Sequence, residues 1–310
     1  MTEEMLNSAN TPAADAPIHR FREEAMATHF ECWIRHEDRE LAHSAANLLF
    51  RDLQIIESRL SRFRDGSDIS HINRMHPGET VLISETCHEC LIQAMELQVI
   101  TNGVFDMATG GFMELLRDLK GEPVLATEEE WARAKERRSR GSLQIDPENP
   151  RVSCLEAGLQ IDLGGIGKGF ALEELSRLLE EMEVRDFLLS AGGSTLKASG
   201  ARTAAGAGWN TRLCGAKHEI EWELKNACLS SSGFEVKGAH ILQNGKVVRD
   251  ARWRRVWVMG PHAALVDGLS TACFLMDREA ILELMQSMEG AVRVWVETQE
   301  GHIDVLASGG

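Results

Sequence analysis

The chain has 310 residues, 43% of them hydrophobic and 26% charged, and its formal net charge is −15 at pH 7. This composition is typical of a globular protein in water, and a chain of this length can bury a sizeable core. Because the average field of such an acidic protein repels polyanions, we expect neither nucleic acid nor an anionic membrane as a partner.

No run of apolar residues approaches the ~18 needed to cross a bilayer, so we expect no membrane span. Residues 1–10 have neither the basic start nor the apolar stretch of a secretory signal. The seven cysteines are scattered along the chain, which suits reduced thiols. Together these features predict a cytoplasmic protein.

The first residues, 1–17, are polar and end in Pro-Ala-Ala-Asp-Ala-Pro. Such a segment has little apolar surface to bury, so we predict a disordered leader. A single domain is then expected over 18–310, where we find no linker and no internal repeat.

Apolar periodicity predicts a strand followed by helices in the first half of this domain. Residues 25–34 alternate as a half-buried strand does, and the apolar stripe that begins at Leu41 predicts a long helix from Glu37. The other expected helices are a short one capped by Ser67, then 84–101, 110–119 and one opened by the capping box Thr127–Glu130.

The second half of the chain is rich in strand patterns. Short strands are expected over 143–146, 151–155, 159–163, 187–190, 211–214, 219–224, 227–230, 240–243, 255–259, 292–297 and 302–306, with helices over 171–182 and from Asp267. Because strands and helices do not alternate regularly, we predict the α+β class, with mixed, largely antiparallel sheets flanked by helices.

A glycine-rich turn stands at the centre of the chain. The expected strand 159–163 runs into glycines at 164, 165, 167 and 169, and a helical pattern follows. Glycines at such a turn let backbone N–H groups approach a ligand, the start of a helix favours an anion, and Lys168 adds a positive charge. The segment follows neither the Walker nor the Rossmann spacing, so it predicts either a phosphate cradle or a tight turn with close backbone packing.

A second group of polar side chains lies about a hundred residues later. Asp267, Ser270 and Thr271 stand at i, i+3 and i+4, which places them on one face of the first turn of the expected helix. Carboxylate and hydroxyl oxygens are hard ligands of the kind that Mg²⁺ takes. The alternative is that Asp267 simply caps this helix.

Seven segments carry a family resemblance. They are Met26-Ala-Thr28, Leu60-Ser-Arg-Phe63 with Ser67 to Asn73, Gly103-Val-Phe-Asp106, Ile161 to Phe170, Ala191-Gly-Gly193, Ser232-Gly-Phe-Glu235 and Asp267-Gly-Leu-Ser-Thr271. In this order they resemble the FAD:protein FMN transferase family, also called ApbE, from about residue 25 to the C-terminus. The resemblance implies an ApbE-like domain that transfers FMN from FAD to a Ser or Thr hydroxyl of an acceptor flavoprotein and releases AMP.

The resemblance also implies the residues of the site. Contacts to FAD are expected at Met26, Phe63, Val104, Phe105, Asp106, Gly164, Lys168, Phe170 and Ile241. Mg²⁺ ligands are expected at the carbonyl of Gly167, Asp267, Ser270 and Thr271, and the catalytic residues are Asp267 and the base His240. We therefore expect the segments around Lys168 and Asp267 to converge on a dinucleotide diphosphate and a divalent cation.

The sequence departs from the family at three places. The family's His-Ile-Ile-Asp-Pro-x-Thr-Gly is here His240-Ile-Leu-Gln-Asn-Gly245, Ser194 replaces a common Asp, and Ala27 replaces a common Gly. The changes concern the acceptor side more than the FAD side. Two alternatives therefore stay open: an FAD pyrophosphatase that releases FMN and AMP, or a non-catalytic FAD-binding module.

Overall fold

The computed structural model describes residues 15–116, 126–233, 242–243, 246–247 and 251–307. The predicted leader 1–17 lies mostly outside this range and stays a prediction. None of the helices within the described part of the chain has both the length and the apolar character that a membrane span requires.

The largest sheet of the described residues has eight strands in the order β1-β2-β6-β7-β10-β13-β14-β15. Its strands are β1 (Ile18–Ala25), β2 (Thr28–Arg35), β6 (Phe187–Ala191), β7 (Thr195–Ser199), β10 (Ala227–Gly233), β13 (Arg255–Gly260), β14 (Arg293–Glu297) and β15 (Ile303–Ala307). All neighbouring pairs are antiparallel. The predicted α+β class with antiparallel sheets is confirmed.

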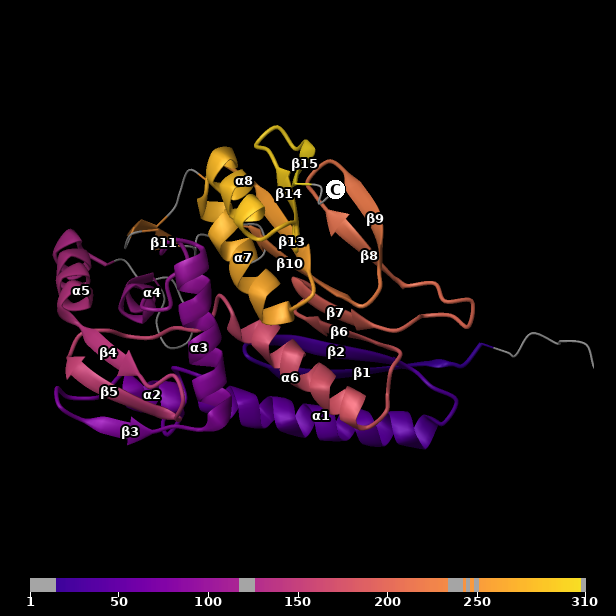
Figure 1. Cartoon of the computed structure of the whole chain (residues 1–310), viewed down its shortest axis with the longest axis horizontal. Helices are drawn as coiled ribbons and strands as arrows, with labels where there is room; N and C mark the ends of the chain where they lie inside the picture. The colour runs from indigo at the N-terminus through magenta and orange to yellow at the C-terminus, as the bar shows by residue number, and fades with distance from the viewer. Residues whose placement is uncertain (1–14, 117–125, 234–241, 244–245, 248–250, 308–310) are drawn as a thin grey trace, which may run out of the picture.

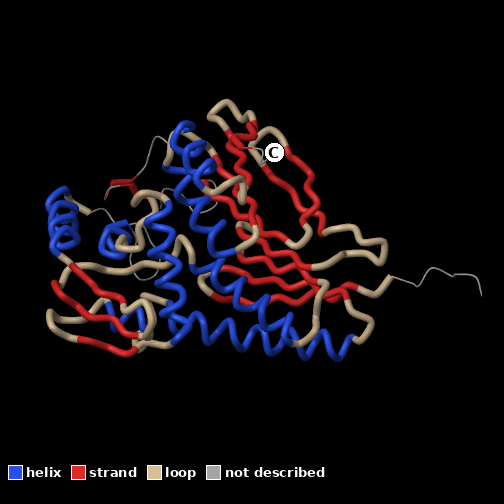
Figure 2. Tube along the Cα trace, in the orientation of Figure 1, coloured by secondary structure: helices blue, strands red, loops and turns tan. Residues whose placement is uncertain are grey.

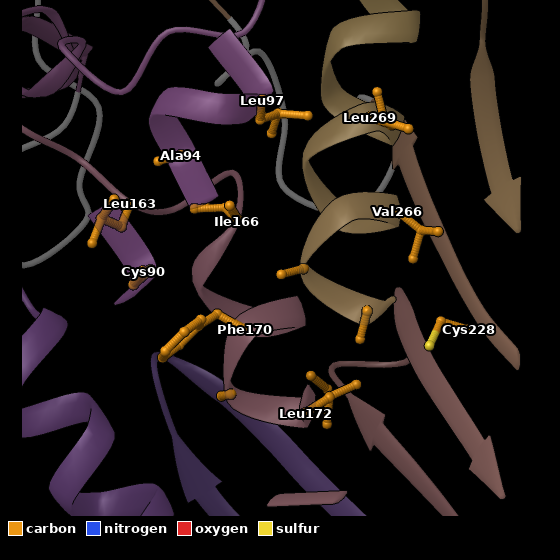
Figure 3. Packing of buried hydrophobic residues seen from close by; sticks show 14 of the residues in the cluster. Cys90, Ala94, Leu97, Leu163, Ile166, Phe170, Leu172, Cys228, Val266 and Leu269 are labelled. Carbon is orange, nitrogen blue, oxygen red and sulfur yellow. The ribbon is translucent and has the colours of Figure 1, made fainter. Parts of the chain in front are cut away.

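Helices cover one face of this sheet (Figure 1). They are α1 (Arg39–Leu60), α6 (Gly167–Glu181), α7 (Ala263–Leu275) and α8 (Arg278–Ser287), and α3 (Glu85–Ile100) packs across α1 and α7. Figure 3 shows buried side chains where α3, α6 and α7 meet, among them Leu97, Ile166 and Leu269. The main hydrophobic core lies in this layer between sheet and helices.

A hairpin of β8 (Trp209–Cys214) and β9 (Glu219–Leu224) covers part of the other face of the sheet, over a second, smaller core. Because side chains alternate along a strand, neighbouring residues of one strand belong to different cores. In β13, Val256 and Val258 belong to the main core, whereas Trp257 between them belongs to the smaller one.

A small lobe lies beside the large sheet, at the left of Figures 1 and 2. Its sheet has the order β3 (Thr80–Leu82), β5 (Arg151–Glu156), β4 (Ser142–Ile145). The lobe also contains α2 (Asp68–Ile72), α4 (Gly110–Leu116) and α5 (Glu128–Arg140), and the two-residue strands β11 (Leu242–Gln243) and β12 (Lys246–Val247) form a separate pair.

Three predicted elements are corrected. The strand expected over 25–34 is the second strand of a hairpin, because Met26 and Ala27 form the turn with φ of 50° and 55°. The long helix begins at Arg39, with Asp38 as its N-cap. The helix expected from Asp267 begins one turn earlier, at Ala263.

The strand expected over 159–163 does not form. Its alternation is real, because Ile161 and Leu163 are buried. However, the backbone of Ile161 is bonded by the side chain of Asn73, which accepts from its N–H at 2.6 Å and donates to its carbonyl at 3.0 Å. The N–H of Asp162 donates to the carbonyl of Met107. A side-chain amide and a loop thus replace a partner strand.

Candidate active site

The starts of α6 and α7 bring together the two polar segments that the sequence singled out. The ammonium Nζ of Lys168 lies 2.9 Å from Oδ1 and 3.1 Å from Oδ2 of Asp267. The backbone N–H of Gly169 donates to Oδ2 at 2.9 Å. Residues nearly a hundred positions apart therefore meet at one carboxylate, as expected.

The carboxylate of Asp267 is buried and fully engaged. The residue is only 2% exposed. Its Oδ1 also accepts hydrogen bonds from Thr195 Oγ1 at 2.9 Å and from Ser230 Oγ at 3.0 Å. A buried carboxylate is tolerated when it is paired with a cation and its oxygens accept hydrogen bonds, and Lys168 and these donors meet both conditions.

Asp267 does not cap its own helix. Because α7 begins at Ala263, Asp267 lies in the second turn, which corrects the first-turn position predicted from the sequence. Its carboxylate instead accepts from the first turn of α6, through Gly169. The sequence pattern of a cap was therefore present, but the capped helix is the neighbouring one.

Hydroxyl groups extend the oxygen-rich surface beside Asp267. Ser270 Oγ donates to the Asp267 carbonyl at 2.9 Å and lies 2.8 Å from Ser232 Oγ. Ser232 Oγ is also 3.3 Å from Thr271 Oγ1. The predicted i, i+3, i+4 arrangement on one helix face is confirmed, and β10 adds a third hydroxyl to it.

These groups fit a divalent cation that shares its ligands with a phosphate. Mg²⁺ is usually bound by one or two carboxylates plus waters and substrate phosphates. Among the described residues there is no cluster of three or more His, Cys, Asp or Glu side chains that could hold a metal by themselves. A hard ion beside Asp267 would take its ligands from this carboxylate, from neighbouring hydroxyl and carbonyl oxygens, and from a bound phosphate or water.

Glycine occupies the positions of the central turn for different structural reasons. A Cβ on Gly169 would lie 2.2 Å from the carbonyl oxygen of Ala263 and 2.6 Å from Cβ of Asp267, so this glycine is required by helix packing. A Cβ on Gly165 would approach the Phe105 ring at 3.1 Å. A Cβ on Gly167 would meet nothing within 4 Å. Close packing explains Gly169 but not Gly167.

The loop that carries Phe105 lies against this turn. Phe105 is only 4% exposed, and its N–H donates to Thr101 Oγ1 at 3.0 Å. The next residue, Asp106, forms an ion pair with Arg138 of α5 and accepts from the N–H of Ala108 at 2.8 Å. Val104 packs against the main core. The three residues predicted from the Gly-Val-Phe-Asp segment thus border the glycine turn and the small lobe.

Phe63 is an exposed ring held on a cation. Its side chain is 58% exposed, and the Arg62 guanidinium lies 4.4 Å from the ring centroid. Arg62 in turn forms an ion pair with Asp162, whose Oδ2 is 2.8 Å from its Nε. Asp162 Oδ1 accepts from the N–H of Gly164 at 2.7 Å. The ring is therefore connected to the glycine turn through two side chains.

The remaining predicted residues are placed as follows. Met26 lies in the β1–β2 turn, where its N–H donates to Glu57 Oε1 at 3.0 Å beside a surface cavity of about 350 Å³. Phe170 is fully buried in the core, where Figure 3 shows it on α6. His240 and Ile241 lie outside the described residues, so their roles stay predictions.

Sequence reasoning missed two residues that contact the site. Thr195, next to the Gly-Gly turn at the start of β7, bonds to Asp267, and nothing in its local sequence indicates this. Arg62 was noted only as part of a motif. Ser230 and Ser232 could have been found from the sequence, because a serine-rich segment that ends in glycine is one of the patterns of a phosphate-binding loop.

Comparisons with known proteins place the chain among flavin transferases. The ApbE family matches residues 26–296. An FAD:protein FMN transferase of Haemophilus influenzae is 24% identical over 295 residues, 87% of this chain and 82% of that protein. One of Treponema pallidum is 25% identical over 280 residues, 82% and 77% of the two chains.

Solved structures show the same fold. A mutant of the flavin transferase ApbE from Vibrio cholerae superposes with a TM-score of 0.83 at 20% identity, over 95% of this chain and 98% of that chain. The apo form of the Pseudomonas stutzeri flavinyl transferase ApbE has a TM-score of 0.80 at 20% identity, over 94% and 96% of the two chains.

Proposed function

The chain belongs to the ApbE family, and we propose that it is an FAD:protein FMN transferase with Mg²⁺ as its metal and a Ser or Thr hydroxyl as its acceptor. The activity is supported by the names of the relatives, which are FAD:protein FMN transferases. The metal is supported by the oxygen-rich residues around Asp267, and the Ser or Thr acceptor is what the family resemblance implies.

The observation that carries the proposal is the meeting of Lys168, the start of α6 and the hydroxyl-lined face of α7 at one buried carboxylate. A diphosphate is a dianion, and it is favoured by an ammonium group and by the positive end of a helix dipole. Oxygen ligands beside them suit a hard cation. One surface thus carries both the groups that favour a pyrophosphate and the oxygen ligands that suit its counter-ion.

The proposed reaction is a displacement at phosphorus. The acceptor oxygen forms a bond to the FMN phosphorus, the bond from that phosphorus to the bridging oxygen breaks, and AMP leaves with the bridging oxygen. The hydroxyl proton passes to a base, a role that we assign to His240 from the family resemblance. Negative charge on the phosphate oxygens grows during this step and must be neutralised.

The chain's own residues divide this work. Lys168, whose side chain is 17% exposed, would pair with a phosphate oxygen in place of Asp267. Asp267, Ser270, Thr271 and the Gly167 carbonyl would hold Mg²⁺, which supplies positive charge to the phosphate oxygens and the leaving group. Thr195 and Ser230 keep the Asp267 carboxylate in place.

The flavin nucleotide needs an apolar and aromatic surface next to this site. Phe63 presents an exposed ring face opposite to the side that Arg62 covers, and such a ring can stack on a planar heterocycle. From the family resemblance we propose the remaining FAD contacts, which are Met26, Val104, Phe105, Asp106, Gly164, Lys168, Phe170 and Ile241.

The test is incubation of the protein with FAD, Mg²⁺ and candidate acceptor flavoproteins. We expect flavin fluorescence on the acceptor band after denaturing electrophoresis, and AMP in equal amount. Free FMN without acceptor would favour the pyrophosphatase, and FAD binding without AMP release would favour a binding module. A His240→Ala variant that transfers FMN at the parent rate would refute the assignment of the base.

A further inference from the structure

The helices α6 and α7 both lack a capping side chain of their own. The N-cap residues are Ile166 for α6 and His262 for α7, and neither makes a side-chain capping bond. The first N–H groups of a helix have no partner within it, and buried N–H groups must find one elsewhere. Both helix starts are buried at Gly167, Gly169 and Ala263, so these partners must come from other elements.

Each helix receives its cap from the other. The N–H of Gly169 in α6 donates to Asp267 of α7, and the N–H of Ala263 in α7 donates to Glu173 Oε2 of α6 at 2.6 Å. Each carboxylate stands four residues, about one turn, after the amide that its own helix contributes. Gly169 packs directly on the Ala263 carbonyl, so the two bonds lie side by side.

One strand braces both carboxylates. In β7, Lys197 Nζ lies 3.0 Å from Glu173 Oε1, and Thr195 Oγ1 donates to Asp267. The two residues are separated by one position, so they project from the same face of the strand. The side chains of Glu173 and Lys197 are 13% and 12% exposed, which makes this a largely buried ion pair. His262 Nδ1 is 3.8 Å from the same Glu173 oxygen.

We propose that Glu173 is a positioning residue for the transfer reaction: through the first turn of α7, it sets where Asp267 stands relative to the start of α6. The expected effect of Glu173 on FMN transfer rests on the proposed function, whereas its expected effect on the start of α7 does not. Without Glu173 the Ala263 N–H would be buried unpaired, and the first turn of α7 would have to shift toward water. Because Gly169 contacts that turn, Asp267 would move with it and loosen its bond to the Gly169 N–H.

The test compares Glu173→Ala with a matched control, Asp277→Ala. Asp277 is the N-cap of α8, a different helix from the one that carries Asp267, and it accepts from the Ala280 N–H at 2.9 Å. Both variants remove one capping carboxylate. Hydrogen–deuterium exchange, resolved to peptides covering 164–172, 262–268 and 277–283, reports each helix start without any substrate.

For Glu173→Ala we expect exchange to accelerate about tenfold at Ala263 and also at Gly169, because a capping bond is lost at one and weakened at the other. The kcat for FMN transfer should fall about tenfold while KM for FAD stays within about twofold, since a misplaced group costs more in the transition state than in binding. Glu173→Gln should keep the exchange rates and the kcat close to those of the parent protein, because its amide oxygen can still accept from the Ala263 N–H. Asp277→Ala should change exchange only in 277–283.

Faster exchange at Ala263 with no change at Gly169 would overturn the proposal, because Glu173 would then be a local cap and nothing more. If Glu173→Ala does not fold, Glu173→Asp, whose carboxylate is one methylene shorter, must show the acceleration at Gly169. A parent protein without transferase activity would refute the proposed function, yet the exchange experiment would still decide the coupling between the helices.

Discussion

Two glycines of one helix turn should respond to alanine in opposite directions. In Gly169→Ala the new Cβ would lie 2.2 Å from the Ala263 carbonyl oxygen and 2.6 Å from Cβ of Asp267, and neither atom can turn away. In Gly167→Ala it would meet nothing within 4 Å. Neither glycine has a positive φ, so the backbone accepts alanine at both positions.

The magnitudes follow from packing and helix propensity. Overpacking costs about 1–3 kcal/mol, and two contacts this short with rigid atoms call for about 3. Alanine in a helix gains up to about 1 kcal/mol over glycine. The net expectation is a loss of about 2 kcal/mol for Gly169→Ala and a gain of up to about 1 kcal/mol for Gly167→Ala.

Thermal unfolding followed by circular dichroism measures both variants. With an unfolding entropy of about 2.1 cal/mol/K per residue, a chain of this size has about 0.65 kcal/mol/K in total. We therefore expect Tm to fall by about 3 °C for Gly169→Ala and to stay equal or rise by up to about 1.5 °C for Gly167→Ala. Equal Tm values for the two variants would refute the packing argument.

The same pair separates packing from ligand binding. If Gly167 is glycine so that a phosphate can approach the backbone, Gly167→Ala should fold normally and yet bind FAD at least about tenfold more weakly. Unchanged FAD affinity in a fluorescence titration would count against a cradle at this glycine.

Three further predictions concern charge, stacking and thiols. Asp267→Asn keeps the shape but removes the charge, so we expect FMN transfer to fall at least about a hundredfold, with FAD affinity by flavin fluorescence changed less than about tenfold; normal transfer would remove Asp267 from the site. Phe63→Ala should weaken FAD binding by about 5–150-fold, the value of one lost stacking contact, and should lower Tm by no more than about 1–2 °C, because the residue is 58% exposed and loses mainly its contact with Arg62; a titration that gives the parent Kd would exclude Phe63 as an FAD contact. Burial raises the pKa of Cys228 and of Cys273 to about 12, and of the seven cysteines Cys214 alone is exposed, so one thiol per chain should react with a disulfide reagent at pH 8 in the native protein.

The sign of the thiol effect on stability follows from the same shifts. A raised pKa means that the folded chain keeps these protons while the unfolded chain loses them near pH 9. Titration of the buried thiols therefore leaves the free energy of unfolding unchanged below pH 9. This free energy should fall as the pH rises from about 9 toward 12. Cys214→Ser is the control for the labelling experiment, and it should leave no thiol that reacts quickly.

Local sequence predicted which side chains share a helix face better than it predicted where that helix begins. The spacing of Asp267, Ser270 and Thr271 placed three oxygens on one helix face, because the helix period alone fixes that arrangement. The start of α7 could not be predicted, since its cap is Glu173, ninety positions away along the chain. A helix whose N–H groups are satisfied by another element shows no capping residue in its own sequence.

One strand prediction failed, and the strands β1, β3, β7 and β12 were not predicted from the sequence. The segment around Ile161 has the alternation of a strand, but the amide of Asn73 satisfies its backbone, and periodicity reports burial rather than the identity of the partner. Strand β1 was missed because it is an edge strand in which half of the residues are Arg or Glu and only Ala25 is buried. A charged edge strand resists pairing with other chains. Its charged residues also replace the apolar alternation by which strands are predicted.

The bracing of two carboxylates by one strand has a consequence for folding fidelity. If β7 slipped by a single residue against β6, Leu196 would exchange faces with Thr195 and Lys197, because side chains alternate along a strand. Leu196 now packs in the smaller, tryptophan-rich core. The misaligned chain would bury a leucine among carboxylates and an ammonium among tryptophans. The charged residues of the site therefore also disfavour a wrong register of the sheet that supports it.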